Sequence, residues 1–177
     1  MNTPNITFKT RVGDNLNLGG GCSIGGSWKD ISTNDLFRGK KVVLFSLPGA
    51  YTPTCSSQQL PGYEEQYDEL RKFVDEVYCL SVNDSFVMNA WFRDQNINKV
   101  KPIGDGEGKF TKEMGMLVNK PKQGFGMRSW RYSALIDNCE VVKLFVEDGK
   151  NNDGKDDDPF QLSDVDTMIN FLKNQIK

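Results

Sequence analysis

The sequence contains no histidine among its 177 residues. Catalytic dyads and triads that use an imidazole base are therefore excluded, whether the nucleophile is serine or cysteine. Most zinc, haem and non-haem iron sites also use histidine ligands, so we do not expect such centres here. A reactive cysteine in this chain must be kept as a thiolate by a group other than imidazole.

The four cysteines lie far apart in the sequence, and no C-x-x-C pair occurs. They are Cys22, Cys55, Cys79 and Cys139. This spacing argues against a zinc ribbon and against a thioredoxin-type dithiol. We therefore expect four free thiols in a reducing compartment.

Long apolar runs and a strong excess of charge of one sign are also absent. No apolar segment approaches the roughly 18 residues of a membrane span, and the N-terminal MNTPNITFKTRVGDN lacks the apolar region of a signal peptide. With a formal net charge of -2, the chain gives no reason to expect nucleic acid or an anionic membrane as a partner. We expect a cytoplasmic protein, or an organellar one if a transit peptide has been removed.

The residues that are present form patterns typical of buried strands and amphipathic helices. Lys41–Leu47 and Val77–Val82 are nearly continuous in apolar and β-branched residues, which predicts strands buried on both faces. Between them, Cys55–Phe73 is predicted to be a helix with a kink or a break at Pro61-Gly62. A final amphipathic helix is predicted over Leu162–Lys177, with Ser163 as its N-cap.

The remaining segments complete an α/β pattern. Short strands are predicted at Asn5–Arg11, Trp28–Ser32 and Lys99–Ile103, and a hairpin is formed by Trp130–Ile136 and Val141–Val146. Helices are predicted at Ser32–Phe37 (N-cap Thr33 or Asn34), Ser85–Asp94 and Lys109–Leu117. Loops are predicted at Leu18–Gly26, Asp105–Gly108 and Asp148–Asp158, and the last of these is expected to be solvated. No repeat or linker interrupts this order. We expect one α/β domain over residues 1–177, with a mixed central β-sheet flanked by helices.

The segment LPGAYTPTCSSQQLPGYEEQY places a lone thiol, Cys55, between a predicted buried strand and the helix that follows. Helix N-termini present unpaired N–H groups and a partial positive charge. Both stabilise a thiolate, which is the nucleophilic form of cysteine. The position therefore predicts a reactive Cys55, with a buried structural thiol as the alternative.

The residues just before Cys55 are typical of a small pocket with one polar group. The Thr52 hydroxyl can donate to the sulfur and accept from an incoming hydroxyl group, and a capping role is compatible with both. Pro53 biases Thr52 toward extended backbone, and Pro48 lies at the strand exit, where it covers the site without offering a competing donor. We expect a thiolate in a narrow, partly dry pocket.

A thiolate without a histidine nearby needs a permanent cation, and two arginines are candidates. Arg131 opens the predicted strand RYSALI, and its charge does not depend on pH. Arg128 lies three residues earlier. Strand position favours Arg131, whereas spacing alone leaves Arg128 open as the alternative.

Pro48, Thr52 and Cys55 match the peroxiredoxin active-site motif P-x-x-x-T-x-x-C residue for residue. Longer phrases resemble the type-five (atypical) peroxiredoxins, namely FSLPGAYTPTCSSQQLPGYEEQ, CLSVNDSFVMNAW, DGEGKFTKEMGMLV and GFGMRSWRYSALIDNCEVVKLFVE. The resemblance runs from about Lys40 to the C-terminus and extends more weakly over Asn5–Lys40. SVNDSFVMNAW and GFGMRSWRYS most resemble the peroxiredoxin half of peroxiredoxin–glutaredoxin hybrids.

The resemblance implies a thioredoxin fold and a thiol peroxidase that needs no metal, haem or flavin. The Cys55 thiolate would attack a hydroperoxide and become a sulfenic acid, while Thr52 and Arg131 bind and activate the peroxide. Arg131 matches the family's arginine, which separates it from Arg128. Pro48 would shield the site, and Phe125 is a candidate apolar wall of the substrate site, with core or dimer packing as its alternative. A homodimer is also implied.

The second half of the catalytic cycle depends on where the other cysteines lie. Two-cysteine members of this type place a resolving cysteine in the loop before the last helix, here Asp148–Phe160, and this loop contains none. We therefore expect a one-cysteine enzyme recycled by an external thiol, either glutathione with glutaredoxin or thioredoxin. Cys22 stays a candidate resolving residue, whereas Cys79 should be inert in its strand and Cys139 incidental in a hairpin turn.

A second hypothesis assigns the same cysteine to a different class of protein. A thioredoxin-fold peroxide sensor or holdase would oxidise Cys55 and bind a partner with little turnover. Steady-state consumption of peroxide in the presence of a reductant separates the two classes.

Overall fold

The computed structural model describes residues 1–14 and 25–176. The predicted loop Leu18–Gly26 falls outside the described residues except for its last two glycines, and Cys22 lies outside them altogether. All other predicted strands and helices can be compared with the structure directly.

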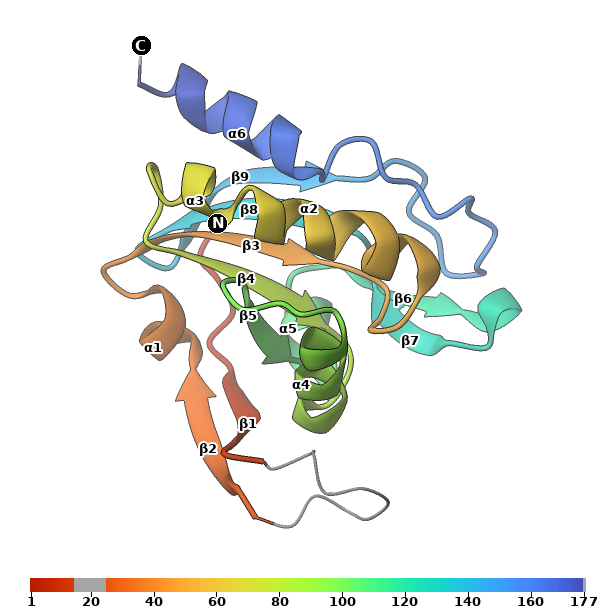
Figure 1. Cartoon of the computed structure of the whole chain (residues 1–177). Helices are drawn as coiled ribbons and strands as arrows, with labels where there is room; N and C mark the ends of the chain where they lie inside the picture. The colour runs from red at the N-terminus through yellow and green to blue at the C-terminus, as the bar shows by residue number, and fades with distance from the viewer. Residues whose placement is uncertain (15–24, 177) are drawn as a thin grey trace.

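A five-stranded mixed β-sheet forms the centre of the molecule, in the order β5-β4-β3-β8-β9 (Figure 1). Its strands are β3 (Lys41–Ser46), β4 (Glu76–Ser81), β5 (Lys101–Gly104), β8 (Tyr132–Asp137) and β9 (Glu140–Val146). β3 pairs in parallel with β4, and β4 with β5, whereas β8 is antiparallel to both β3 and β9. The predicted mixed sheet and the predicted hairpin of its last two strands are both confirmed.

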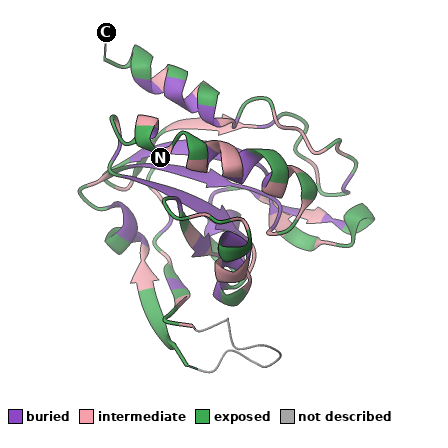
Figure 2. Cartoon of the chain, in the orientation of Figure 1, coloured by how far each residue is buried: buried purple, intermediate pink, exposed green. Residues whose placement is uncertain are grey.

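Alternating residues of the central strands face two separate hydrophobic cores. On β3, Val43 and Phe45 belong to the first core, and Val42 and Leu44 belong to the second. The first core is covered by α2 (Leu60–Glu65), α3 (Tyr67–Leu70), α4 (Ser85–Asp94) and α6 (Val165–Asn174), and the second by α1 (Thr33–Phe37), α5 (Lys109–Glu113) and β1 (Thr7–Val12). The central strands are accordingly buried, while the outer sides of the helices are exposed (Figure 2). This arrangement is the predicted thioredoxin fold.

Two antiparallel ribbons lie outside the central sheet. β1 pairs with β2 (Ser27–Ser32); both strands were predicted, but their pairing was not. β6 (Leu117–Lys120) pairs with β7 (Gly126–Ser129) across the 3-10 turn η2 (Pro121–Gln123). The second ribbon was not predicted, because LVNK and GMRS are too short to show the alternation of a strand. β7 carries Arg128 and is followed almost at once by Arg131.

The helix that contains Cys55 differs from the prediction in its start and its interruption. Helical backbone begins at Pro53, and the segment η1 (Cys55–Gln59) is π-helical before α2 continues from Leu60. Pro61 has no N–H to donate to a carbonyl four residues earlier, so widened helical geometry is accommodated here. The predicted break at Pro61-Gly62 is wrong, since the helix is interrupted at Gln66, between α2 and α3.

Two predicted helix caps are each displaced by one or more residues. The N-cap of α1 is Ser32 rather than Thr33 or Asn34, because Ser32 Oγ accepts from Asp35 N while Asp35 accepts from Ser32 N in a capping box. The N-cap of α6 is Asp164 rather than Ser163. Serine at position 163 is fully buried and donates instead to Glu147.

Glu147 organises the chain that leads into α6. Its buried carboxylate accepts hydrogen bonds from Gln161 N, Leu162 N, Ser163 N and Ser163 Oγ at 2.8–2.9 Å. We expect Glu147→Leu to lower the free energy of unfolding by about 2 kcal/mol, because it leaves buried donors without an acceptor. Glu147→Gln keeps an acceptor oxygen and should lose clearly less in the same urea titration. Equal losses in the two variants would contradict this role.

The predicted solvated loop Asp148–Asp158 is a loop in which most residues are exposed, but two contacts also attach it to the fold. Asp156 forms an ion pair with Lys120 at 2.8 Å, and their side chains are only 5% and 4% exposed. Gln123 Nε2 also donates to Gly154 O at 3.1 Å, and Gly154 is buried. The acidic composition suggested solvation, but the segment is fastened to the β6–β7 hairpin.

Candidate active site

Cys55 lies in the first helical turn after the exit from β3. The chain leaves β3 at Ser46, passes the buried Pro48 and enters helical backbone at Pro53, the first helical position that proline favours. Backbone N–H groups in the first turn of a helix have no acceptor within the helix, so Cys55 lies where they and the helix dipole favour an anion. Its side chain is fully buried, and the predicted narrow pocket around it stays a prediction.

Thr52 caps this helix and directs its hydroxyl proton away from the sulfur. Its carbonyl accepts from Ser56 N at 3.0 Å, and its Oγ1 donates to Gly49 O at 2.7 Å. The predicted donation from Thr52 to Cys55 is therefore replaced by donation to Gly49. With its proton used in this way, the hydroxyl oxygen keeps lone pairs that can accept from an incoming O–H group.

Arg131 reaches Cys55 because of the register between β3 and β8. Tyr132, the first residue of β8, pairs with Ser46, the last residue of β3, so Arg131 lies just beyond the end of β3 where the chain turns toward Cys55. Arg131 Nη1 donates to Cys55 Sγ at 3.4 Å. The side chain is only 2% exposed, so this cation is held beside the sulfur and away from water.

Two further side chains hold Arg131, and neither was predicted. Arg131 Nη1 donates to Gln59 Oε1 at 2.5 Å, and its Nη2 donates to Asp158 Oδ1 at 2.5 Å. The Phe160 ring centroid lies 5.7 Å from the guanidinium carbon. Gln59 follows Cys55 by four residues, a spacing that places both on one side of a helix and could have indicated it. Nothing local to Asp158 indicated a partner 27 residues away.

Two nitrogen atoms beside this site have no hydrogen-bond partner in the described part of the chain. They are Gln59 Nε2 and Arg131 Nε, and both are buried. A buried donor without a hydrogen bond costs free energy, and native proteins rarely contain one without a functional reason. They are available to a small oxygen-containing ligand that enters next to Cys55.

The two arginines differ in their electrostatic surroundings. Burial alone would lower the pKa of Arg131, but the nearby Cys55 sulfur and the Asp158 carboxylate outweigh it and raise that pKa above its usual value. Burial lowers the pKa of Arg128, and only the more weakly acting Cys55 opposes this effect. Arg131 is therefore the guanidinium that its surroundings most strongly hold in the charged form.

Arg128 and Phe125 contact each other rather than Cys55. Arg128 Nε donates to Phe125 O at 3.1 Å, and its guanidinium carbon lies 5.6 Å from the centre of the Phe125 ring. The half-buried Phe125 thus packs beside the second cation. Its predicted place in the substrate site stays a prediction.

The two other described cysteines lie in unlike places. Cys79 is fully buried in β4 and shares the first core with Cys55. Burial raises the pKa of the Cys79 thiol well above its ordinary value, which opposes thiolate formation. Cys139 lies in the turn between β8 and β9, packs against the second core and is half-buried.

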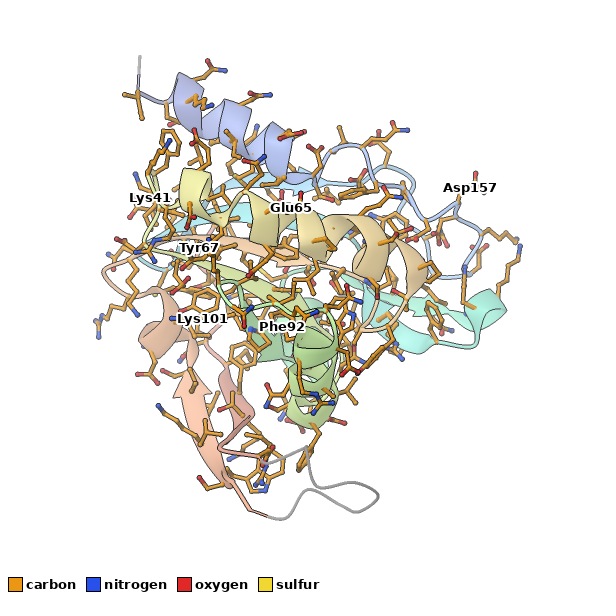
Figure 3. All side chains as sticks on the ribbon, viewed as in Figure 1. Lys41, Glu65, Tyr67, Phe92, Lys101 and Asp157 are labelled. Atoms are coloured by element: carbon orange, nitrogen blue, oxygen red, sulfur yellow. The ribbon has the colours of Figure 1, made fainter. Side chains whose placement is uncertain are left out.

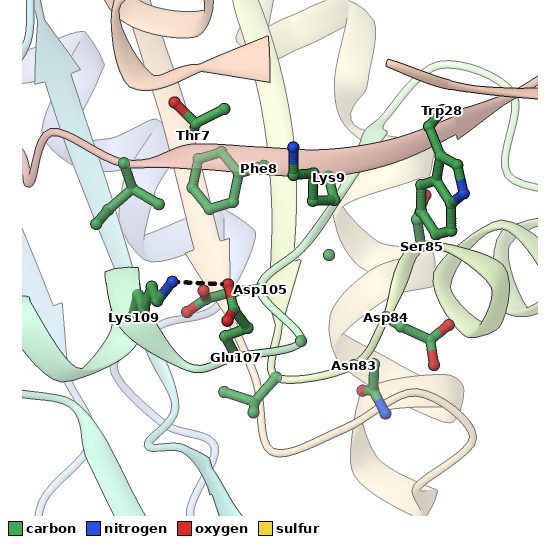
Figure 4. A pocket seen from close by; sticks show the side chains of 14 residues that line it. Thr7, Phe8, Lys9, Trp28, Asn83, Asp84, Ser85, Asp105, Glu107 and Lys109 are labelled. Carbon is green, nitrogen blue, oxygen red and sulfur yellow. Dashed lines mark ion pairs between the residues drawn. The ribbon is translucent and has the colours of Figure 1, made fainter. Parts of the chain in front are cut away.

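A separate cleft lies away from these residues. It encloses about 460 Å³ between β1 and the ends of β4 and β5, and Figure 4 shows Asp84 on one wall and the Lys109–Glu107 ion pair on another. None of Cys55, Thr52 and Arg131 lines it. Across residues 1–14 and 25–176, no group of three or more cysteine and carboxylate side chains is placed to hold a metal ion. The helices of these residues are also too short or too polar to span a bilayer.

Comparisons with known proteins agree with this geometry. A family model described as Redoxin matches residues 20–168. A peroxiredoxin of Synechocystis sp. is 49% identical over 175 residues, which cover 96% of this chain and 88% of the relative. A hybrid peroxiredoxin of Haemophilus influenzae is 48% identical over 97% of this chain, which spans 65% of that relative.

Solved structures give the same result. The Plasmodium falciparum antioxidant protein, titled a 1-Cys peroxiredoxin, superposes with a TM-score of 0.88 at 40% identity and covers 98% of each chain. Reduced Prx3 of Vibrio vulnificus in complex with hydrogen peroxide superposes with a TM-score of 0.83 at 35% identity, over 99% of this chain and 96% of that one. The chain therefore belongs to the peroxiredoxins, thiol peroxidases that reduce peroxides with a cysteine.

Proposed function

We propose that this peroxiredoxin reduces hydrogen peroxide and small alkyl hydroperoxides with Cys55 as its nucleophile. The observation that carries the proposal is the buried Arg131 guanidinium, 3.4 Å from the Cys55 sulfur in the first turn of a helix. A permanent cation and a helix N-terminus together keep the sulfur as a thiolate without any histidine.

The proposed reaction begins with attack of the Cys55 thiolate on one peroxide oxygen. A sulfur–oxygen bond forms as the O–O bond breaks, and the leaving oxygen takes a proton to depart as water or an alcohol. Cys55 is oxidised to a sulfenic acid, and the peroxide is reduced. Arg131 stabilises the negative charge that moves across the breaking bond, and the Thr52 oxygen accepts the peroxide O–H because its own proton is donated to Gly49. Pro48 shields the site without adding a donor.

We infer that an external thiol, rather than a second cysteine of this chain, reduces the sulfenic acid. Cys139 lies beside the start of β3, since Asp137 pairs with Lys41, whereas Cys55 follows the end of that strand. A six-residue strand separates the two ends by roughly 17 Å, and a disulfide needs its Cα atoms within about 7 Å. Cys79 is fully buried within β4, and burial raises the pKa of its thiol. Cys22 lies outside the described residues, so peptide mapping decides on it.

We propose glutathione with glutaredoxin as the reductant, with thioredoxin as the alternative. One thiol would displace water from the sulfenic acid to give a mixed disulfide, and a second would release reduced Cys55. The resemblance to the peroxiredoxin half of peroxiredoxin–glutaredoxin hybrids supports this choice.

We also propose a homodimer. Several large apolar side chains are exposed. Among them, Trp28 and Phe86 pack edge to face with ring centres 5.4 Å apart, and they are 57% and 39% exposed. Sedimentation of the reduced protein at micromolar concentration tests this assembly, and a monomer would overturn it.

One equivalent of hydrogen peroxide added to the reduced protein should convert Cys55 alone to a sulfenic acid within seconds. Intact-mass measurement and peptide mapping after rapid trapping would check this result, because the other cysteines should keep free thiols. A Cys55–Cys22 or Cys55–Cys139 disulfide would overturn the one-cysteine mechanism. Rapid oxidation followed by negligible steady-state turnover with glutathione and glutaredoxin, and with thioredoxin, would instead indicate a peroxide sensor or holdase.

A further inference from the structure

We propose that Asp158 is a positioning residue that holds Arg131 in the orientation required by Cys55, and that residues 148–160 are fastened to the fold so as to present it. The inference rests on the proposed role of Arg131. It adds a carboxylate from a distant loop to a site that the sequence motif places around Cys55.

The contacts of Arg131 show why one carboxylate can set its orientation. The guanidinium is planar and rigid, so a bond that fixes one nitrogen also fixes the other two. Nη2 donates to Asp158, while Nη1 donates to both Cys55 and Gln59. Hydrogen bonds between ionised groups are about twice as strong as neutral ones. Asp158 therefore holds Nη2 of the rigid guanidinium, and this orients Nη1 toward the Cys55 sulfur.

Asp158 adopts an unusual backbone conformation to make this contact. Its φ is +51°, in the left-handed region that a non-glycine residue enters at a free-energy cost. Its N–H donates to Asp156 Oδ1 at 3.0 Å, which holds the turn. The Asp158 side chain is 41% exposed, whereas that of Arg131 is 2% exposed, so the carboxylate reaches inward from the surface to the buried cation.

The segment that carries Asp158 is attached by a buried ion pair. Asp156 pairs with Lys120 of β6, and the Lys120 ammonium lies 5.1 Å from the centre of the Trp130 ring. Trp130 is the residue before Arg131 and is itself buried. Removing one member of a buried ion pair is strongly destabilising, so the pair defines the position of this loop relative to Arg131. The loop and the arginine are thus anchored to the same hairpin.

The charge of Asp158 makes it possible to distinguish a positioning role from electrostatic support of the Cys55 thiolate. A carboxylate beside Arg131 partly cancels the positive potential at the sulfur, so it disfavours the Cys55 thiolate. Other charged or titratable groups that act electrostatically on this site are Arg128 and the Cys79 thiol. An anion here is useful only if the orientation that it gives to Arg131 outweighs this electrostatic effect. Removal of the charge should therefore change thiolate formation and reaction rate in opposite directions.

The test compares Asp158→Asn with Asp157→Asn, a matched change at the neighbouring position. Asp157 is exposed and points outward from the same loop (Figure 3), and no hydrogen bond or ion pair joins its side chain to another described residue. Two quantities are measured in stopped-flow and spectroscopic experiments. They are the rate constant for oxidation by hydrogen peroxide at a pH where the thiolate is fully formed, and the pH midpoint of thiolate absorbance.

We expect Asp158→Asn to lower the oxidation rate constant about tenfold, the scale of a lost charge-assisted hydrogen bond, and to move the thiolate midpoint to lower pH. Asp158→Glu, which keeps the charge, should recover part of the rate, and Asp157→Asn should match the wild-type chain. A rate within twofold of wild type in Asp158→Asn, or a slower rate without the shift in midpoint, would overturn the proposal. Failure of the wild-type chain to consume peroxide would refute the proposed function instead, and the two failures are therefore distinguishable.

Discussion

Cys55→Ser should abolish peroxide turnover, with the residual rate indistinguishable from that of buffer with reductant. A serine hydroxyl ionises far above neutral pH, and the site contains no imidazole to remove its proton, since the sequence has no histidine. Arg131 and the helix N-terminus stabilise an anion but cannot make an alkoxide at neutral pH. Steady-state peroxide consumption with a saturating thiol reductant measures the loss.

Cys79→Ser is the matched control, because the two thiols lie in one core and are both fully buried. Burial raises the pKa of Cys79 and keeps it protonated, so its removal should leave the oxidation rate within about twofold, provided that the variant folds. Cys139→Ser changes a half-buried turn residue and gives a second control with little structural risk. Full activity in Cys55→Ser, or its loss in either control, would show that the nucleophile has been misassigned.

The parts of this fold that could be predicted are those determined by nearby residues. Lys41–Leu47 and Val77–Val82 became β3 and β4 almost unchanged, because a continuous apolar run that is buried on both faces has few other structures available. The Asp137–Glu140 hairpin was also predictable, because the segments on both sides of this turn alternate between apolar and polar residues. In the structure Asn138 and Cys139 both take positive φ in a two-residue turn.

The surroundings of Arg131 could not be predicted in this way. The run Asp156–Asp158 has the composition of a solvated loop, and only the three-dimensional structure shows that Asp156 meets Lys120 and Asp158 meets Arg131. These partners are 36 and 27 residues apart and are brought together by the unpredicted β6–β7 hairpin. The position of Gln59 beside Cys55 could have been predicted, because the two residues have a helical spacing. An amide side chain at that position does not by itself indicate a bond to an arginine.

The choice between the two arginines illustrates how much the structure adds. Sequence position alone left Arg128 open, and the resemblance to the peroxiredoxins favoured Arg131. Both arginines are close enough to Cys55 for electrostatic interaction with it. Of the two, only Arg131 donates directly to the sulfur, and only Arg131 is paired with a carboxylate of a described residue. Arg128 instead bonds to the backbone oxygen of Phe125 and stacks on its ring.

We therefore expect Arg131→Met to lower the rate constant for oxidation by hydrogen peroxide by about a hundredfold or more, the scale of losing one preorganised donor in the transition state. Arg128→Met should lower it by less than about tenfold, because a charge without a direct hydrogen bond contributes only through the local potential. Rapid-mixing measurements of Cys55 oxidation in both variants provide the comparison.

Arg131→Lys sharpens this prediction, because it keeps the charge and removes the planar fork. If charge alone activates Cys55, the lysine variant should be nearly as fast as the wild-type chain. If orientation matters, it should remain close to Arg131→Met, since a single ammonium cannot bond to Cys55, Gln59 and Asp158 in the same geometry. A larger loss in Arg128→Met than in Arg131→Met would reverse the assignment and make the β7 arginine the one that activates the peroxide.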